Sequence, residues 1–356
     1  MKILVSGVAG FIGSNFLYYY LNKHMNGEII GIDNLTYAGN LSNLLNLQKK
    51  DRSRFAFIKG DINNFKLISN IFKKYAIDGV INFAAESHVD RSIIDPHVFL
   101  KTNILGTQNL LDVCKQNWKK KREYSEFNKF LQISTDEVYG SLGPTGFFTE
   151  ETPLNPRNPY SASKASADLL VKAHYETFDL PVNITRCSNN YGPYQFPEKL
   201  IPLMIHKAIK HEQLPVYGDG KQIRDWIFVR DHCVAIDEIF EKGKLGEVYN
   251  IGGHCERKNI DVVKKIIQIV SESCKDSAIN ENLISYVRDR PGHDRRYAIN
   301  TKKIENEIGW KPSINFEDGL KKTIQWYLNN KEWLENITNK SYIKTNKKLV
   351  KTFEKK

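Results

Sequence analysis

The chain has 356 residues, 41% of them hydrophobic and 26% charged, which is the composition of a globular protein large enough for one big domain or two modest ones. The net charge of +11 could suggest nucleic-acid binding, but residues 321–356 carry +7 of it, so the excess belongs to the C-terminal end and does not indicate a basic groove. No apolar run is long enough to span a membrane, no signal-peptide pattern precedes the first strand, and neither the five cysteines nor the nine histidines show metal-ligand spacing; we therefore expect a cytoplasmic protein with reduced thiols and no metal, membrane or nucleic-acid partner.

A glycine-rich turn follows the first predicted strand. An apolar run at residues 2–6 predicts a buried parallel strand, and an apolar helical pattern runs from residue 14 to about residue 23. Between them, Gly7 would permit a tight turn, Gly10 the approach of a pyrophosphate, and Gly13 close packing of helix on strand. Strand, glycine turn and helix are the context that a dinucleotide fingerprint needs, with the first helical amides facing the phosphates.

The second predicted strand, residues 28–32, ends at Asp33, twenty residues after Gly13. A carboxylate at this place can accept hydrogen bonds from both ribose hydroxyls of a dinucleotide, and it repels a 2′-phosphate. The sequence therefore favours NAD over NADP. The alternative, a glycine-rich turn that binds no ligand, is disfavoured by the acid at this position.

Strands and helices then alternate along the chain. Strands are predicted at residues 55–59, 79–83, 131–134 and 182–186, and helices at residues 63–75, 98–117 and 160–178. This spacing predicts an α/β fold with a doubly wound parallel Rossmann sheet. After two of these strands, Asp61 and Ile62 could hold an adenine ring, and the small Ala84 and Ala85 let the chain pass close to a flat cofactor.

Beyond residue 186 loops lengthen, and helices are predicted at residues 231–240, 259–273, 301–308 and 316–329. We expect residues 1–186 to form mainly the NAD-binding domain, and residues 187–330 a smaller, interwoven C-terminal α/β substrate domain. Arg224, Arg288 and Arg290 are candidates for binding phosphate. Residues 331–356 form a basic tail, and from about residue 341 the lysine-rich, non-periodic sequence predicts disorder.

Two groups of residues indicate acid/base chemistry. Thr135, Asp136 and Glu137 follow the strand at residues 131–134, at the end of the sheet where ligands bind. Tyr160 and Lys164 are four apart and share a helix face, where a lysine would favour the phenolate. The alternative is that the two acids cap a turn and Tyr160 is an ordinary core residue.

Four motifs, at residues 33–40, 84–92, 134–140 and 290–297, together with the glycines, Tyr160 and Lys164, carry a family resemblance. From residue 1 to about residue 330 the chain resembles the extended short-chain dehydrogenase/reductase family, also described as NAD-dependent epimerases/dehydratases, and within it the dTDP-glucose 4,6-dehydratases. The adjacent Asp136–Glu137 pair is the most specific element, because related 4-epimerases lack it. The tail after about residue 330 is longer than the resemblance leads us to expect.

The resemblance implies a lyase reaction on a nucleotide sugar. Tyr160 would deprotonate the sugar 4-hydroxyl while carbon 4 is oxidised by NAD, and Thr135 would hydrogen-bond the 4-oxygen. Glu137 would take the carbon 5 proton, and protonated Asp136 would release the 6-hydroxyl as water. Hydride return to carbon 6 gives dTDP-4-keto-6-deoxyglucose, for deoxysugar (for example rhamnose) biosynthesis.

The resemblance also implies two sets of binding residues. The cofactor set is Gly7, Gly10, Phe11, Ile12, Gly13, Asp33, Asn34, Leu35, Thr36, Asp61, Ile62, Phe83, Ala84, Ala85, Ser87, Thr102, Ser134, Tyr160, Lys164 and Asn190. The substrate set is Ser87, Thr135, Asn189, Lys199, Leu200, Pro215, Tyr217, Arg224, Asn259, Arg290, His293 and Tyr297. A homodimer through a four-helix bundle is expected as well.

Several alternatives stay open. UDP-glucose differs from dTDP-glucose in its base by one methyl group, which gives only modest discrimination. A 4-epimerase needs no acid/base pair for elimination, so Asp136 and Glu137 argue against it. Proteins of other classes would be a non-catalytic NAD- or sugar-binding regulator, or a nucleic-acid binder acting through the tail.

Overall fold

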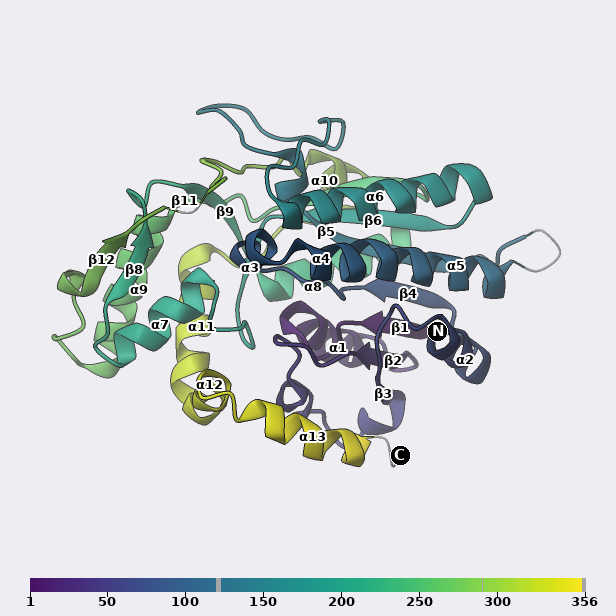
Figure 1. The fold of residues 1–356 in the computed structure, drawn as a ribbon, viewed down its shortest axis with the longest axis horizontal. Helices are drawn as coiled ribbons and strands as arrows, with labels where there is room; N and C mark the ends of the chain where they lie inside the picture. The colour runs from purple at the N-terminus through teal and green to yellow at the C-terminus, as the bar shows by residue number, and fades with distance from the viewer. Residues whose placement is uncertain (120–122, 290, 354–356) are drawn as a thin grey trace.

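The computed structural model describes residues 1–119, 123–289 and 291–353, and it is built on a large parallel sheet. Among these residues, seven strands pair in the order β10-β6-β5-β4-β1-β2-β3, every neighbouring pair parallel (Figure 1). The strands are β1 (Lys2–Ser6), β2 (Glu28–Asp33), β3 (Phe55–Lys59), β4 (Gly79–Asn82), β5 (Lys129–Thr135), β6 (Val182–Cys187) and β10 (Val248–Ile251). The predicted doubly wound α/β fold is confirmed.

Helices cover both faces of this sheet, because its strands are apolar on both sides. Alternate residues of β1 point to opposite faces, so Ile3 and Val5 pack with one set of helices and Leu4 with the other. The first set is α1 (Phe11–Lys23) and α8 (Val229–Lys242); the second is α2 (Phe65–Tyr75), α5 (Gly106–Trp118) and α6 (Pro159–Phe178).

The predicted helix at residues 98–117 is built from three successive elements. They are α4 (Pro96–Phe99), the π-helical turn η3 (Leu100–Leu105) and α5, and the short α3 (Val89–Ile94) precedes them. A π-helical turn within a longer helix is frequent at functional sites. Short 3₁₀ turns occur at η1 (Leu41–Leu44), η2 (Arg52–Arg54), η4 (Asp136–Tyr139) and η5 (Glu281–Leu283).

A smaller part packs beside the carboxyl edge of the sheet (Figure 1). It holds a three-stranded sheet of order β11-β9-β7 and the pair β12-β8, with its own apolar core. Its elements are β7 (Asn189–Tyr191), α7 (Leu200–Ile209), β8 (Leu214–Tyr217), β9 (Ile223–Phe228), β11 (Glu256–Lys258), α9 (Asn259–Cys274), β12 (Ile284–Val287) and α11 (Phe316–Asn329). The chain returns to the large sheet at β10 and α10 (Lys302–Ile308), so the two parts alternate in sequence, and the boundaries at residues 186 and 330 stay predictions.

The prediction of disorder after about residue 341 is wrong for the residues that the structure describes. Helices α12 (Lys331–Thr338) and α13 (Tyr342–Phe353) run from the smaller part to the β3 edge of the sheet (Figure 1). Phe353 packs its ring 5.6 Å from that of Phe57 on β3, and Asn346 is buried. The lysine content concealed an amphipathic pattern, in which the inward positions recur at helical spacing.

None of the helices in the described part of the chain combines the length and hydropathy that crossing a membrane requires.

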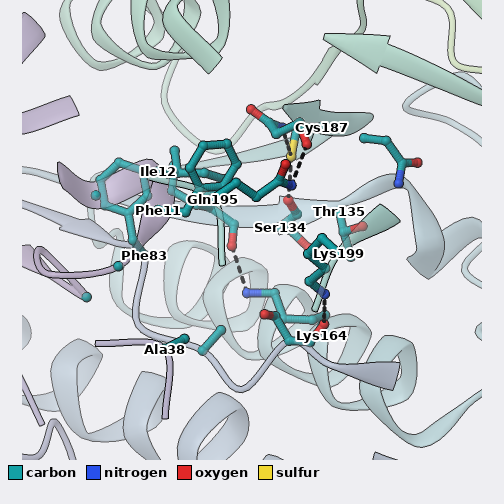
Figure 2. Close-up of a pocket in the computed structure, with 18 of the residues that line it drawn as sticks. Phe11, Ile12, Ala38, Phe83, Ser134, Thr135, Lys164, Cys187, Gln195 and Lys199 are labelled. Carbon is teal, nitrogen blue, oxygen red and sulfur yellow. Dashed lines mark hydrogen bonds between the residues drawn. The ribbon is translucent and has the colours of Figure 1, made fainter. Parts of the chain in front are cut away.

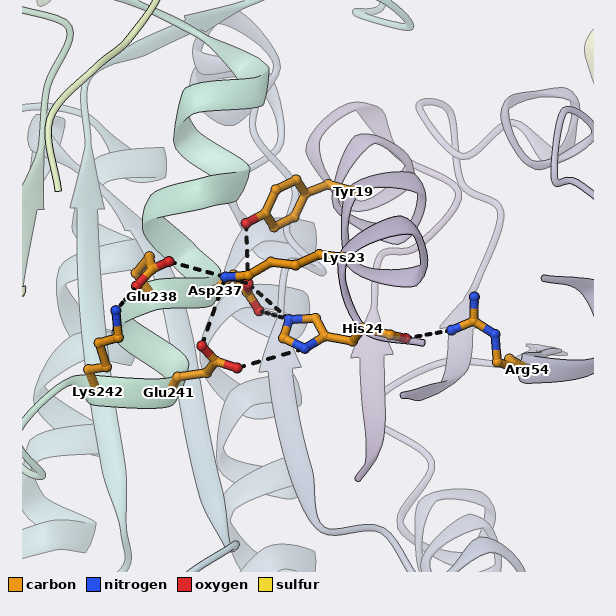
Figure 3. A network of polar contacts seen from close by, with 8 residues as sticks. All are labelled: Tyr19, Lys23, His24, Arg54, Asp237, Glu238, Glu241 and Lys242. Atoms are coloured by element: carbon orange, nitrogen blue, oxygen red, sulfur yellow. Dashed lines mark hydrogen bonds and ion pairs between the residues drawn. The ribbon is translucent and has the colours of Figure 1, made fainter. Parts of the chain in front are cut away.

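An ion-pair network fastens the end of α1 to α8 (Figure 3). Asp237, whose side chain is 1% exposed, accepts hydrogen bonds from Lys23 Nζ at 2.8 Å and pairs with His24 Nε2 at 2.9 Å. Glu241, 40% exposed, lies 3.7 Å from His24 Nδ1 and 3.9 Å from Lys23 Nζ. His24, Asp237 and Glu241 are close enough to suggest a metal site, but the lysine ammonium already fills the space between the acids.

We expect Asp237→Asn to lower the free energy of unfolding by about 2 kcal/mol, because the buried charged acceptor of Lys23 and His24 is lost. Glu241→Gln, one turn further along the same helix, is the matched control and should change it by less than about 0.5 kcal/mol, since exposed pairs contribute little. Urea unfolding of the two variants measures both values. If both variants lost the same free energy of unfolding, the burial of Asp237 would not explain how the network stabilises the fold.

Candidate active site

Two adjoining cavities open at the carboxyl ends of the central strands, where the strand order reverses between β1 and β4. The larger, of about 260 Å³, extends from the glycine turn to the ends of β5 and β6, and the smaller, of about 100 Å³, lies between β2 and β4. Gly7, Gly10 and Ala38 line both. This crevice is the usual ligand site of an open parallel sheet.

The glycine turn leaves no room for side chains. Gly7 has φ +69°, and a Cβ added to Gly13 would lie 2.2 Å from the Gly7 carbonyl oxygen. Helix α1 starts after Gly10 with no side chain capping its first turn, so its first amides are available to an anion at the cavity. Phe11, Ile12 and Phe83 lie together on one side of the larger cavity (Figure 2).

Asp33 stands at the end of β2, beside the smaller cavity. Its carboxylate accepts hydrogen bonds from the backbone amides of Leu35 at 2.8 Å and Ala9 at 3.0 Å. Burial raises the pKa of Asp33 to about 6, and these two amides act against that rise. A glycine cradle beside an acid with unused oxygen lone pairs fits a dinucleotide whose ribose hydroxyls are free.

The other predicted cofactor residues divide between the two cavities. Asn34, Thr36, Asp61, Ile62, Ala84 and Thr102 line the smaller, Ser87, Ser134 and Asn190 the larger, and Ala85 both. Leu35 lines neither: it has φ +55° and contributes its backbone amide to Asp33.

Strand β5 ends by delivering two acids into the larger cavity. The Thr135 hydroxyl accepts from the Glu137 amide at 3.3 Å and so caps the 3₁₀ turn η4, which places Asp136 and Glu137 in its first turn. The acids therefore sit in a capped turn, as the structural alternative predicted, and they also line the cavity.

Asp136 is buried and electrostatically frustrated. Thr135 donates to its Oδ1 at 3.3 Å, while Asp136 Oδ2 and Glu137 Oε2 have no hydrogen-bond partner among the described residues. Burial raises the pKa of Asp136 well above its ordinary value, and the neighbouring charges of Glu137 and Asp225 raise it further. Both effects favour the protonated form of Asp136, which has a hydroxyl to donate next to a second carboxyl group.

Helix α6 brings Tyr160 and Lys164 to the same cavity. Its start is set by Pro159 in the first turn and by a capping box in which Asn158 and Ser161 bond each other's backbone amides. Tyr160 packs edge-on to Phe99, with 6.3 Å between ring centroids. Lys164 Nζ donates to the Ile133 carbonyl at 2.7 Å (Figure 2).

The expectation that Lys164 makes Tyr160 a phenolate is wrong for the protein alone. Burial raises the pKa of Tyr160 well above its ordinary value, and the charge of Glu137 adds to the rise. Burial likewise lowers the pKa of Lys164, whose ammonium is turned to the Ile133 carbonyl.

Part of the predicted substrate set approaches the two acids. Arg224 is buried and lies over the Tyr297 ring at 4.3 Å, donating to the Asp294 carbonyl at 3.0 Å. The charge of Arg224 lowers the pKa of Asp136, and that of Glu137 helps burial to raise the pKa of Tyr297, so both side chains lie within electrostatic reach of the acid pair. Asn189 and Lys199 line the larger cavity.

Neither cavity is lined by Arg224, Tyr297 or the other predicted substrate residues that the structure describes, which are Leu200, Pro215, Tyr217, Asn259 and His293. The Tyr217 hydroxyl donates to Asp90 at 3.3 Å, and its ring meets that of His293 at 6.3 Å. Pro215 is in β8, and Leu200 and Asn259 are the first residues of α7 and α9. Arg290 falls outside the described residues.

Several residues that the sequence did not indicate also line the larger cavity, among them Cys187, Gln195, Phe196 and Glu198. Glu198 directly precedes the predicted Lys199, so the loop was recognised and the acid in it was not. Gln195 donates to the Asn190 carbonyl at 2.9 Å, a contact between loop residues that no spacing reveals.

Comparison with known proteins relates the chain to nucleotide-sugar enzymes. Residues 4–323 match a family model described as GDP-mannose 4,6 dehydratase. A dTDP-glucose 4,6-dehydratase of Xanthomonas campestris is 50% identical over 342 residues, covering 95% of this chain and 96% of that protein. A dTDP-glucose 4,6-dehydratase of Escherichia coli is 50% identical over 356 residues, covering 96% of this chain and 98% of that protein.

Solved structures extend the likeness to the whole fold. The dTDP-glucose 4,6-dehydratase of Bacillus anthracis in complex with NAD has a TM-score of 0.85 and 49% identity, covering 95% of this chain and 99% of that one. DesIV of Streptomyces venezuelae, also a dTDP-glucose 4,6-dehydratase and solved with NAD and TYD bound, has a TM-score of 0.85 and 41% identity. The match covers 95% of this chain and 100% of that one. A UDP-glucose 4-epimerase of Thermotoga maritima has a TM-score of 0.81 but only 26% identity, and the match covers 92% of this chain and 99% of that one.

The raised pKa of Asp136 predicts a pH-dependent gain in stability for Asp136→Asn. Above about pH 4 the unfolded chain ionises this carboxyl while the folded protein keeps it protonated, so wild-type stability falls as pH rises and the variant escapes this loss. The difference in free energy of unfolding between variant and wild type should grow by up to about 1.4 kcal/mol per pH unit above that point.

Urea unfolding between pH 4 and 8 measures this slope. Asp219→Asn, measured down to pH 2, gives a slope of the opposite sign below about pH 4, because the hydrogen bond from Arg295 lowers the pKa of that exposed acid to about 2. Its stabilising pair is present above about pH 4 and is lost as pH falls toward 2. A pH-independent gain for Asp136→Asn would contradict a protonated Asp136.

Proposed function

This chain belongs to the family described as GDP-mannose 4,6 dehydratase, and on that premise we propose that it is an NAD-dependent dTDP-glucose 4,6-dehydratase, a hydro-lyase. The observation that carries the proposal is the position of the buried Asp136 next to Glu137, in the same cavity as Tyr160, with burial and the charge of Glu137 raising the pKa of Asp136. Removal of water needs an acid and a base side by side, whereas epimerisation does not. The choice of dTDP-glucose over GDP-mannose rests on the relatives of that name, which are 47–50% identical over nearly the whole chain.

The cofactor is NAD, in keeping with the titles of the two dehydratase structures and with the fit of the glycine turn and Asp33. When bound, NAD supplies the oxidant for carbon 4 and, as NADH, the reductant for carbon 6, and its oxidised form brings a positive charge into the cavity. The glycine turn and the first amides of α1 bind the pyrophosphate, and Asp33 accepts from the ribose hydroxyls.

Tyr160 begins the reaction as the base. Tyr160 first gives its own proton to solvent, its phenolate oxygen then takes the proton of the sugar 4-hydroxyl while carbon 4 is oxidised, and Thr135 hydrogen-bonds the same sugar oxygen. Burial raises the pKa of Tyr160 and so disfavours its phenolate. Tyr160 therefore loses its proton only when a positive charge in the cavity stabilises the phenolate. Lys164 adds to that charge.

Asp136 and Glu137 then divide the loss of water between them. Glu137 removes the carbon 5 proton, which the new 4-ketone makes acidic, and Asp136 gives its proton to the 6-oxygen. The carbon 6–oxygen bond breaks, water leaves, and a double bond forms between carbons 5 and 6. After reduction of carbon 6, Glu137, whose proton has exchanged with solvent, protonates carbon 5, and the proton taken by Tyr160 replaces, through solvent, the one lost by Asp136.

The nucleotide diphosphate is held by residues of the smaller part. Arg224 supplies positive charge close to Asp136. Lys199 lines the larger cavity and supplies a second positive charge, and its Nζ also donates to the Ser87 carbonyl at 2.8 Å. Pro215 and Tyr217 take the base, and Arg290, His293 and Asn259 complete the set that the family resemblance implies. Asn259 Oδ1 is buried without a partner among the described residues, as a ligand-facing acceptor would be.

The functional unit is a homodimer in this proposal. Helices α3 to α6 expose large apolar side chains on one side of the sheet, including Ile94 at 84%, Leu105 at 59% and Leu169 at 59%. Such side chains on neighbouring helices suit an interface between two copies. A cytoplasmic location stays a prediction from the sequence.

The substrate is tested by proton NMR of the purified protein with dTDP-glucose and, separately, UDP-glucose in deuterated water. We expect a new sugar methyl signal with deuterium at carbon 5, and faster conversion of dTDP-glucose. Faster conversion of UDP-glucose would reassign the nucleotide. A galactose-type spectrum without a methyl signal would show a 4-epimerase, and no change with either sugar would reject both.

The roles of Glu137 and Tyr160 are separated by single turnovers followed through NADH absorbance. Glu137→Gln should still oxidise carbon 4, so NADH accumulates and product formation falls by about 10²–10⁴-fold, the usual contribution of a general base. Tyr160→Phe should instead slow the appearance of NADH itself. Normal turnover by the glutamine variant, or an unchanged oxidation rate in the phenylalanine variant, would remove the respective residue from its role.

A further inference from the structure

The segment of residues 37–41 forms part of the cofactor site and is held from behind by the C-terminal helices. Ala38 lines both cavities and Gly39 the smaller one. On its inner side, the Asn40 amide donates to the Ala9 carbonyl of the glycine turn at 3.0 Å. The segment belongs to no strand, so its other backbone groups need partners from elsewhere in the protein.

Asn346 of α13 provides two of these partners with one side chain. Its Oδ1 accepts from the Leu41 amide at 2.9 Å, and its Nδ2 donates to the Gly39 carbonyl at 2.8 Å. All three residues are buried. The amide side chain thus replaces the neighbouring strand that the segment lacks, and without it two buried backbone groups would be unsatisfied.

Tyr342 holds the segment one helical turn earlier. Its hydroxyl donates to the Tyr37 carbonyl at 2.7 Å, and its ring meets that of Phe196, which lines the larger cavity, at 6.1 Å. The Tyr37 hydroxyl in turn donates to Glu198 at 3.0 Å. The start of α13 therefore contacts both the cofactor segment and the loop on the substrate side.

We propose that Tyr342 and Asn346 are positioning residues that keep residues 37–41 closed over the bound dinucleotide and so slow the release of NAD. The inference rests on the proposed function, in which NAD ends each cycle as it began and has no need to leave. Phe353, packed on β3, anchors the far end of the same helix, while Lys347 and Lys348 point into solvent.

The test measures NAD release from purified protein loaded with NAD, after rapid desalting and dilution. Asn346→Leu, which keeps the size of the side chain but neither hydrogen bond, should release NAD roughly tenfold faster, as expected for losing about one net hydrogen bond. Tyr342→Phe, which keeps the ring contact with Phe196, should show a smaller increase. With saturating NAD added, kcat of both variants should stay within about twofold of the wild type.

Two controls separate positioning from general stability. Lys347→Ala, adjacent to Asn346 but exposed, should leave NAD release unchanged. Asp237→Asn destabilises the fold at α1 and α8 and should also leave NAD release unchanged well below the unfolding temperature. Should Asn346→Leu fail to fold, Tyr342→Phe alone carries the test, because it removes a single hydroxyl.

Release at the wild-type rate from both variants would overturn the inference, as would equal acceleration by Asp237→Asn. A wild-type protein that binds NAD and converts dTDP-glucose separates that failure from failure of the proposed function. A wild-type protein that neither retains NAD nor forms product would overturn both.

Discussion

The pairing of β1 with β2 on one side and β4 on the other brings three carboxyl ends together where the strand order reverses. Each end delivers one part of the cofactor site: the glycine turn after β1, Asp33 at the end of β2, and Ala84 and Ala85 after β4. Because parallel strands end at the same edge, β5 then delivers Thr135 and its two acids beside that site without any special loop. The close contact of Gly13 with Gly7 fixes how near α1 can approach.

The proposed chemistry depends on two neighbouring carboxyl groups whose burial is unfavourable, and the rest of the fold must supply the stability that this costs. Asp136 is buried next to Glu137, with only Thr135 as a hydrogen-bond partner among the described residues, so its charged form is unfavourable. A protein selected for stability alone would not place a poorly paired acid there. The buried networks elsewhere, such as Arg186 with Asp168 at 2.9 Å, show that this chain pairs its internal charges where no reaction needs them free.

The smaller part and the C-terminal helices complete the site from outside the central sheet. Arg224 and Tyr297 come from segments more than 80 residues after the acids in the sequence, yet the charge of Arg224 lowers the pKa of Asp136, and the charge of Glu137 raises that of Tyr297. Helices α12 and α13 extend from that smaller part back to the cofactor segment, where Trp333 donates to Asn43 at 2.8 Å and Asn346 to Gly39. A continuous set of contacts therefore runs from the substrate side, around the outside of the sheet, to the cofactor side.

The sequence by itself determined the parallel sheet, the glycine turn, Asp33 and the pairs Asp136–Glu137 and Tyr160–Lys164, because these depend on local patterns of polarity, glycine and helical spacing. Only the tertiary structure decided the direction in which the pKa values of Asp136 and Tyr160 shift, since burial depends on residues distant in sequence. It also turned Lys164 toward the Ile133 carbonyl and brought Glu198 to the cavity. The tail shows the same division, because its lysines indicated disorder whereas the structure shows an amphipathic helix. A helix of this length is marginal in isolation, so it is stable only when packed against β3 and residues 37–41.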